Sequence, residues 1–195
     1  MESKFETGQI PPSNGWSESL PCLFEETPPY LHWSVCRASS HRLNTQPIRF
    51  LHYHLEMEIG LCISGNGRLY LGDLVIPFQA GDVQIILPYQ THYNVTECEN
   101  TQWKFICFDP TSMHSAHIRP DCEFLQTILA DCRLSGIFPP GKFPALAQSL
   151  IAITDLALSP TGNPYDEDCL LTELTNFMVL LSRTQCTDIN ITQQI

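Results

Sequence analysis

Short apolar runs alternate with turn residues along the middle of the chain, and this pattern predicts a series of short β-strands. The turns carry glycine beside aspartate, as in Gly72-Asp73 and Gly81-Asp82, and such pairs suit tight connections between antiparallel strands. The expected strands cover residues 31–37, 48–54, 56–64, 68–71, 74–77, 83–87, 92–95 and 102–108. Closing short antiparallel strands into a barrel removes exposed edges, so we expect a small jelly roll.

After Pro110 the apolar residues take the spacing of amphipathic helices. We expect helices over residues 123–133, 143–158 and 165–183, separated by the breakers GIFPPG and SPTGNP. For the last helix we expect Asn163 as the N-cap and Pro164 at the first helical position. Its broad apolar face needs a cover, which is either the rest of the chain or a second subunit. This face consists of Leu170, Leu171, Leu174, Phe177, Met178 and Leu181.

These patterns divide the chain into three parts and predict a mainly β fold with α-helices after it. Residues 1–25 carry polar and proline-rich sequence, which is typical of an arm rather than of a core element. Residues 26–112 hold the predicted barrel, and residues 113–195 hold two or three helices followed by TQCTDINITQQI. We interpret TQCTDINITQQI as a linker toward a further part of the protein.

Charge and cysteine content narrow the functional class. With 10 basic and 21 acidic residues, the formal charge is −11, which excludes strong binding of a phosphate backbone by these residues themselves. The 9 cysteines form no C-x-x-C pair and are interpreted as reduced, mostly buried residues. We find neither a signal-peptide pattern nor an apolar run of the roughly 20 residues that a membrane span requires. We therefore expect a cytoplasmic protein that does not enter a membrane.

The candidate chemistry lies in the stretch HYHLEMEIG and in a later histidine, His92. His52, His54 and Glu58 share the same parity, so on a regular strand their side chains leave one face of the sheet and enter the barrel. A buried glutamate needs a partner, and two imidazoles with a divalent cation provide one. Glu56 has the same parity, and a bulge near residues 55–57 would change which glutamate points inward.

This stretch resembles the cupin family. His52, His54, Glu58 and Gly65 match the first cupin motif, H-x-H-x3-E-x6-G, at every defined position. The second motif is met only in part: Gly81 and His92 fit, whereas Leu87, Tyr89 and Thr96 replace the usual proline, glycine and asparagine. In cupins the positions of His52, His54, Glu58 and His92 are the metal ligands. The resemblance therefore implies a site for a divalent metal such as Zn, Ni, Mn or Fe, and spacing does not choose among them.

The order of the whole stretch, from the histidine strand to the final helices, is similar to the effector-binding and dimerisation domain of AraC/XylS-type transcriptional regulators. The resemblance implies a non-enzymatic domain that binds a small-molecule effector, forms a homodimer and reaches DNA only through a C-terminal domain absent from this chain. Expected ligand-binding residues are Trp33, Phe50, His52, His54, Glu58, Tyr70, His92 and Trp103. The expected dimer interface consists of Leu170, Leu174, Phe177, Met178 and Leu181.

Two other interpretations remain open at this point. A metal-dependent cupin enzyme, such as a dioxygenase or an isomerase, would use the same three histidines and one glutamate with open coordination positions. A structural cupin-like module would keep the fold without a ligand in its barrel.

Overall fold

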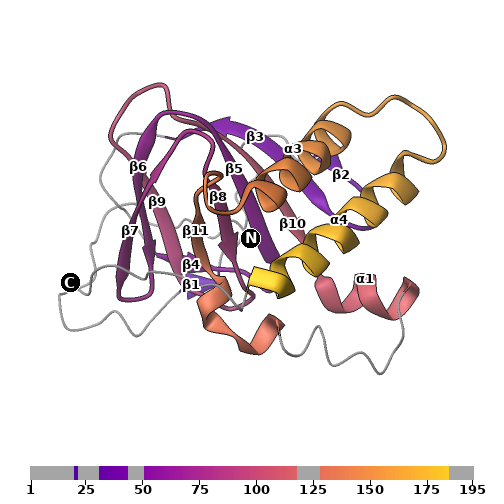
Figure 1. Ribbon diagram of the computed structural model, residues 1–195, viewed down its shortest axis with the longest axis horizontal. Coiled ribbons are helices and arrows are strands. Elements are labelled where there is room, and N and C mark those ends of the chain that lie inside the picture. The colour runs from indigo at the N-terminus through magenta and orange to yellow at the C-terminus, as the bar shows by residue number, and fades with distance from the viewer. Residues whose placement is uncertain (1–19, 22–30, 44–50, 118–127, 185–195) are drawn as a thin grey trace, which may run out of the picture.

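The computed structural model describes residues 20–21, 31–43, 51–117 and 128–184, which form two β-sheets and a layer of helices (Figure 1). In the described part of the chain, the five-stranded sheet has the order β1-β4-β9-β6-β7 and the six-stranded sheet the order β11-β8-β5-β10-β3-β2. The first sheet contains β1 (Leu20–Pro21), β4 (His52–Tyr53), β6 (Asn66–Leu71), β7 (Leu74–Gln79) and β9 (His92–Thr96). The second contains β2 (Leu31–His32), β3 (Arg37–Arg42), β5 (Met57–Ser64), β8 (Val83–Ile86), β10 (Gln102–Phe108) and β11 (Gly136–Phe138).

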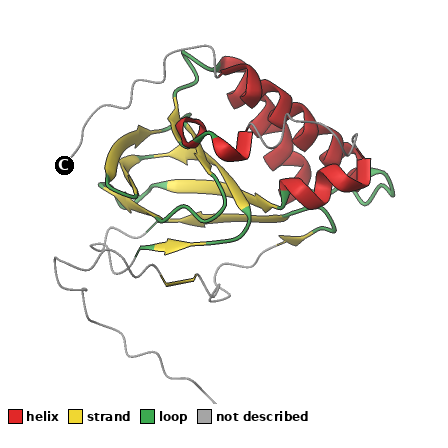
Figure 2. Cartoon of the chain, turned by 90° about the horizontal axis from the view of Figure 1, so that it is seen from below, coloured by secondary structure: helices red, strands yellow, loops and turns green. Residues whose placement is uncertain are grey.

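The two sheets face each other, and the predicted jelly-roll barrel is confirmed (Figure 2). In the described part of the chain the strands pair antiparallel except for β1, which is parallel to β4. Six expected strands, from β5 to β10, lie where the apolar runs and turns placed them. The turn between β5 and β6 depends on Gly65, whose φ is 89° and whose position leaves no room for a Cβ beside Thr101. Among the described helices, none combines the length and the apolar character needed to cross a membrane.

The expected strand over residues 31–37 is wrong, because this stretch turns in its middle. The Trp33 amide donates a hydrogen bond to the Cys36 carbonyl (2.8 Å), and β2 then pairs with β3 as a hairpin. β3 in turn pairs along its length with β10. The expected strand over residues 48–54 is short in the structure, where only His52–Tyr53 is a strand and residues 44–50 lie outside the described part.

Helices α3 (Pro144–Leu158) and α4 (Asp166–Arg183) cover the outer face of the six-stranded sheet. The predicted helical spacing of apolar residues is confirmed for both helices. Pro144 begins α3, and three acidic residues in the first turn of α4 interact favourably with its dipole. Asn163 is not the N-cap of α4, since that position is Tyr165; the Asn163 side chain instead accepts a hydrogen bond from the Tyr165 amide (3.0 Å).

The apolar face of α4 is core, and this corrects the expected dimer interface. All five predicted interface residues are 0–1% exposed within a single chain and pack against α3 and the sheet. These residues are Leu170, Leu174, Phe177, Met178 and Leu181. Each contributes about 1.5–3 kcal/mol to folding. A side chain already buried in one chain has no surface left for a partner, so any dimer must use other residues.

Three elements had no sequence prediction: β1, which lies in the stretch expected to be an arm, α1 (Pro110–His117) and β11. The 3₁₀ turn η1 (Cys132–Leu134) overlaps the end of the expected helix over residues 123–133. The stretch GIFPPG was interpreted as a breaker, yet its first three residues pair with β8 as an added strand. Local propensity does not reveal such pairing, because the neighbouring strand supplies the hydrogen bonds. Of the expected helix over residues 123–133, residues 123–127 lie outside the described part, residues 128–130 are helical, and the chain then enters η1.

Candidate functional site

Alternation along β5 and β10 decides which side chains enter the barrel. Met57, Ile59 and Leu61 pack in the core beneath the helices, so Glu58, Gly60 and Cys62 face the interior. On β10 the interior residues are Trp103, Phe105 and Cys107, and Cys107 lies directly opposite Glu58 in the register. Because both strands are central in the sheet, these interior positions are rigidly placed.

The two inward histidines come from the ends of strands in and near the opposite sheet. His54 lies in the bend between β4 and β5, where its Nδ1 contacts the Glu56 carbonyl oxygen at 2.7 Å. His92 begins β9, and its Nδ1 contacts the Gln90 carbonyl oxygen at 2.9 Å. A carbonyl only accepts, so both Nδ1 atoms carry the proton, and each neutral ring presents its Nε2 lone pair to the interior.

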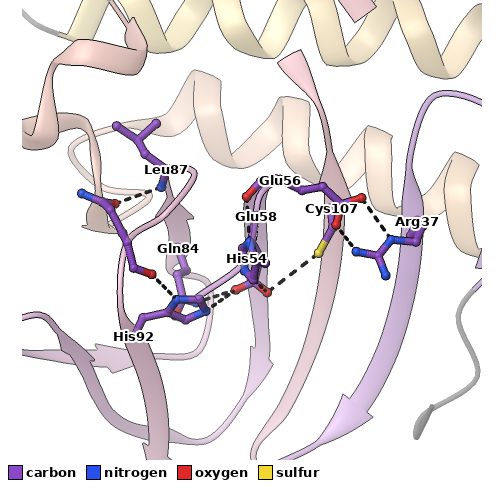
Figure 3. Close-up of polar contacts among 9 residues, drawn as sticks. Arg37, His54, Glu56, Glu58, Gln84, Leu87, His92 and Cys107 are labelled. Atoms are coloured by element: carbon purple, nitrogen blue, oxygen red, sulfur yellow. Dashed lines mark hydrogen bonds and ion pairs between the residues drawn. The ribbon is translucent and has the colours of Figure 1, made fainter. Parts of the chain in front are cut away.

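These Nε2 atoms converge on the Glu58 carboxylate (Figure 3). His54 Nε2 lies 3.5 Å from Oε2, and His92 Nε2 lies 3.7 Å from Oε1. Within the described part of the chain, the ligand atoms of His54, Glu58 and His92 all lie within 4.8 Å of one another. Atoms that bind one cation at about 2.0–2.2 Å are separated by roughly 3–4 Å, so the donor set fits a divalent metal.

His52 lies beside this group rather than within it. Its ring centroid is 4.4 Å from that of His92 and 6.4 Å from that of His54, and His52 and His92 are paired between β4 and β9. The side chain is half-buried. The structure thus brings three of the four expected ligands together and places the fourth next to them.

Electrostatics keep the carboxylate charged. Burial favours the neutral form of Glu58, yet the close approach of His54 Nε2 and the other nearby imidazoles together hold the pKa of Glu58 below the ordinary value. Burial also opposes protonation of His54, but Glu58 outweighs this and raises the His54 pKa. Burial lowers the pKa of His92 and lowers that of His52 to about 3. At neutral pH, Glu58 is therefore anionic while His52 and His92 are neutral, the forms that bind metals.

The structure decides between the two glutamates. Glu56 points away from the histidines and forms an ion pair with Arg37, with 3.1 Å between Nε and Oε1 (Figure 3). The regular strand assumed from residue 52 to residue 58 does not exist, because β4 ends at Tyr53 and β5 begins at Met57. The bend between them separates two residues of equal parity, so Glu58 enters the barrel while Glu56 stays at its edge.

The remaining expected ligand residues lie apart from this group. Trp33 packs outside the barrel, where its Nε1 donates to the Ala157 carbonyl of α3 (3.1 Å), and it lines a separate cavity of about 350 Å³ beside α1. Tyr70 lies on the face of β6 opposite to the buried Leu69 and Leu71. Trp103 faces the interior but is fully buried and stacked on Phe105. Phe50 lies outside the described residues.

Two interior residues escaped the sequence analysis. Gln84 on β8 donates from Nε2 to Glu58 Oε1 (3.1 Å), and the Cys107 thiol lies 3.9 Å from Oε2 (Figure 3). Neither belongs to a motif, and both sit in apolar runs. Strand parity was the available signal, because residues 84 and 107 take the inward positions of their strands.

Comparison with solved structures finds partial likenesses to the oxalate decarboxylase of Bacillus subtilis. One structure of that enzyme, at pH 4.6, has a TM-score of 0.35 and 22% identity over 38% of this chain and 21% of the enzyme. A further structure of an oxalate decarboxylase, on its substrate binding mode and a switch in reaction specificity, has a TM-score of 0.36 with the same identity and coverage. The aligned part thus spans about a fifth of that enzyme. No match was found among curated proteins.

The match to a protein family covers more than half of the chain. The profile of the AraC-like ligand binding domain matches residues 38–172, from β3 through the sheets and α3 into α4. The matched region contains the three converging side chains, all of α3 and the first part of α4. This chain therefore belongs to the family of AraC-like ligand-binding domains.

Proposed function

We propose that this chain is the ligand-sensing part of an AraC-type transcriptional regulator and that it binds a small-molecule effector in its barrel. The observation that supports this most is the convergence of His54, Glu58 and His92 inside the barrel of a chain from this family. A buried carboxylate facing two imidazole lone pairs needs a cation or a polar ligand for compensation. His52 would complete the wall of the pocket. In this proposal the domain is not an enzyme.

The same residues are proposed to hold a divalent metal such as Zn, Ni, Mn or Fe. His54 and His92 would bind through Nε2, since each Nδ1 is hydrogen-bonded to a carbonyl that fixes the ring. Glu58 would supply the negative charge, and His52 is the candidate fourth ligand. When bound, such a cation supplies a Lewis acid that attracts an oxygen or nitrogen of an effector.

Contacts lead from this group toward the helices. The Glu56 carbonyl oxygen accepts a hydrogen bond from His54 Nδ1, and the Glu56 carboxylate forms an ion pair with Arg37 of the β2–β3 hairpin. Further along the same hairpin, the Ser34 amide donates to Glu167 of α4. An effector that moves His54 would therefore bias the arrangement of hairpin and helices. We propose that this arrangement controls a homodimer and, through a C-terminal domain outside this chain, its contact with DNA.

The first test is metal content and binding in protein purified without a histidine tag. We expect one bound metal per chain, and loss of that binding in His92→Ala. His32→Ala, an exposed histidine on β2, is the matched control and should bind as the wild type does. If the wild type neither retains nor binds any of the four metals, the metal part of the proposal fails.

The second test is a thermal-shift screen of sugars, aromatic acids and other metabolites. An effector at 100 times its dissociation constant should stabilise the domain by about 2.7 kcal/mol, and sedimentation should then show whether it changes the oligomeric state. A chain that stays monomeric with and without its ligand would exclude the dimer. Chemical conversion of a bound compound, followed by mass spectrometry, would favour a metal-dependent enzyme, for which the same donor set is the supporting observation.

A further inference from the structure

Side chains of both neighbouring strands contact the Glu58 carboxylate. Gln84 of β8 donates to its Oε1 (3.1 Å), and the Cys107 thiol of β10 lies 3.9 Å from its Oε2. The two histidines divide the carboxylate in the same way, with His92 nearer Oε1 and His54 nearer Oε2. Each carboxylate oxygen therefore faces one protein donor and one histidine.

Gln84 sits where packing alone would favour an apolar residue. It is fully buried, and the other residues of β8 are Val83, Ile85 and Ile86. Its Oε1 has no hydrogen-bond partner in the described part of the chain, so the amide is only half satisfied. A buried amide left in this state is unfavourable. The side-chain hydrogen bond to Glu58 is the favourable interaction that offsets this cost.

Cys107 contributes as a donor and not as a further ligand. The group of atoms lying within 4.8 Å of one another contains His54, Glu58 and His92 but not the Cys107 sulfur. The thiol nevertheless donates toward Oε2 across 3.9 Å, and the register pairs Cys107 directly with Glu58. The thiol is thus placed to limit rotation of the carboxylate.

We propose that Gln84 and Cys107 are positioning residues that fix the plane of the Glu58 carboxylate toward His54 and His92. The inference rests on the proposed metal site, since a fixed carboxylate matters most when a cation lies between the three side chains. Residues that orient a metal ligand typically contribute 10–100-fold to metal affinity. We assign the larger part to Gln84, because its hydrogen bond is shorter and its donor stronger than a thiol.

Titration with Co²⁺ tests this assignment, because the visible spectrum of bound Co²⁺ reports the geometry of its ligands. Gln84→Met should lower Co²⁺ affinity by about 10–100-fold and alter the spectrum. Cys107→Ala should have a smaller effect in the same direction. Gln84→Asn, which keeps the amide but shortens it, should lose affinity as Gln84→Met does and serves if that variant does not fold.

Cys62→Ala is the matched control for Cys107→Ala. Cys62 is a buried thiol on β5, faces the same interior and bonds Ser64 instead of Glu58, so its removal should leave Co²⁺ affinity unchanged. Wild-type affinity and spectrum in Gln84→Met, Gln84→Asn and Cys107→Ala would overturn the positioning role while leaving the metal site intact. Absence of Co²⁺ binding by the wild type would instead defeat the metal site itself.

Discussion

The two ends of the barrel interior are built by the same strands and behave in opposite ways. At one end Glu58 of β5 and Cys107 of β10 face the histidines. At the other end Trp103 stacks on Phe105 (5.3 Å between centroids, 7° between planes) and meets Phe78 edge-on (4.9 Å). The aromatic end is filled by its own rings, whereas the charged end needs something added. Stability should therefore depend mainly on the aromatic end and binding on the charged end.

The largest effect on folding is expected for Trp103→Ala. Trp103 is fully buried, and its removal should lower the free energy of unfolding by about 3–5 kcal/mol, as measured by chemical denaturation. Metal affinity of the fraction that remains folded should stay near the wild-type value. A stability loss below 1 kcal/mol would contradict the division between the two ends.

The opposite outcome is expected for Glu58→Gln. Loss of a direct ligand should cost more than the 10–100-fold typical of a supporting residue, so metal affinity measured by calorimetry should fall by over about 100-fold. The metal-free variant should unfold within about 1 kcal/mol of the wild type, because the amide keeps the shape of the side chain. Equal losses of stability in Glu58→Gln and Trp103→Ala would erase the contrast.

A smaller effect on folding is expected where the two ends meet, at Gly60. A Cβ there would lie 2.7 Å from the Phe105 ring and 3.1 Å from Trp103. Gly60→Ala should therefore overpack the aromatic end and destabilise the domain by roughly 1–3 kcal/mol. Gly141→Ala, where nothing lies within 4 Å of the added atom, is the control. If both variants unfold alike, the aromatic end is not tightly packed.

The smallest effect is a pH dependence from His41, whose ring lies 5.2 Å from that of Phe105. Burial lowers the His41 pKa, and the negative charge of Glu58 offsets this only in part. The unfolded chain, with a histidine pKa of about 6.5, therefore takes up the proton first. Stability from neutral His41 is present above about pH 6.5 and is lost as the pH falls, by at most about 1.4 kcal/mol per pH unit.

Denaturation of the wild type and of His41→Phe at pH 7.5 and pH 5.5 measures this contribution, because His52, His54 and His92 are common to both proteins. The variant should gain stability relative to the wild type at the lower pH. A difference that does not change with pH would show that His41 titrates alike in the folded and unfolded chain.

Sequence patterns predicted the charged end better than they predicted its surroundings. The cupin-like spacing identified His54, Glu58 and His92, and the apolar run over residues 102–108 placed β10. Parity alone did not separate Glu56 from Glu58, because a bend of three residues interrupts the strand. The apolar face of α4 was recognised, but its partner was not, since amphipathicity shows that a face is covered without showing by what.

The residues that support the site were the hardest to foresee. Gln84 and Cys107 contact Glu58 only because β8 and β10 lie on either side of β5, which is a property of the sheet order. The hairpin that places Trp33 against α3 is likewise a tertiary contact.

Strand β5 lies between β8 and β10 and is buried on both faces from Met57 to Cys62. One face supports the helical core, and the other carries Glu58. Such a strand has no local route to solvent, so its amide hydrogens should exchange with deuterium only when the whole domain opens. The β5 backbone that carries Glu58 therefore stays ordered for as long as the domain is folded. A ligand can bind at the charged end without having to order this strand.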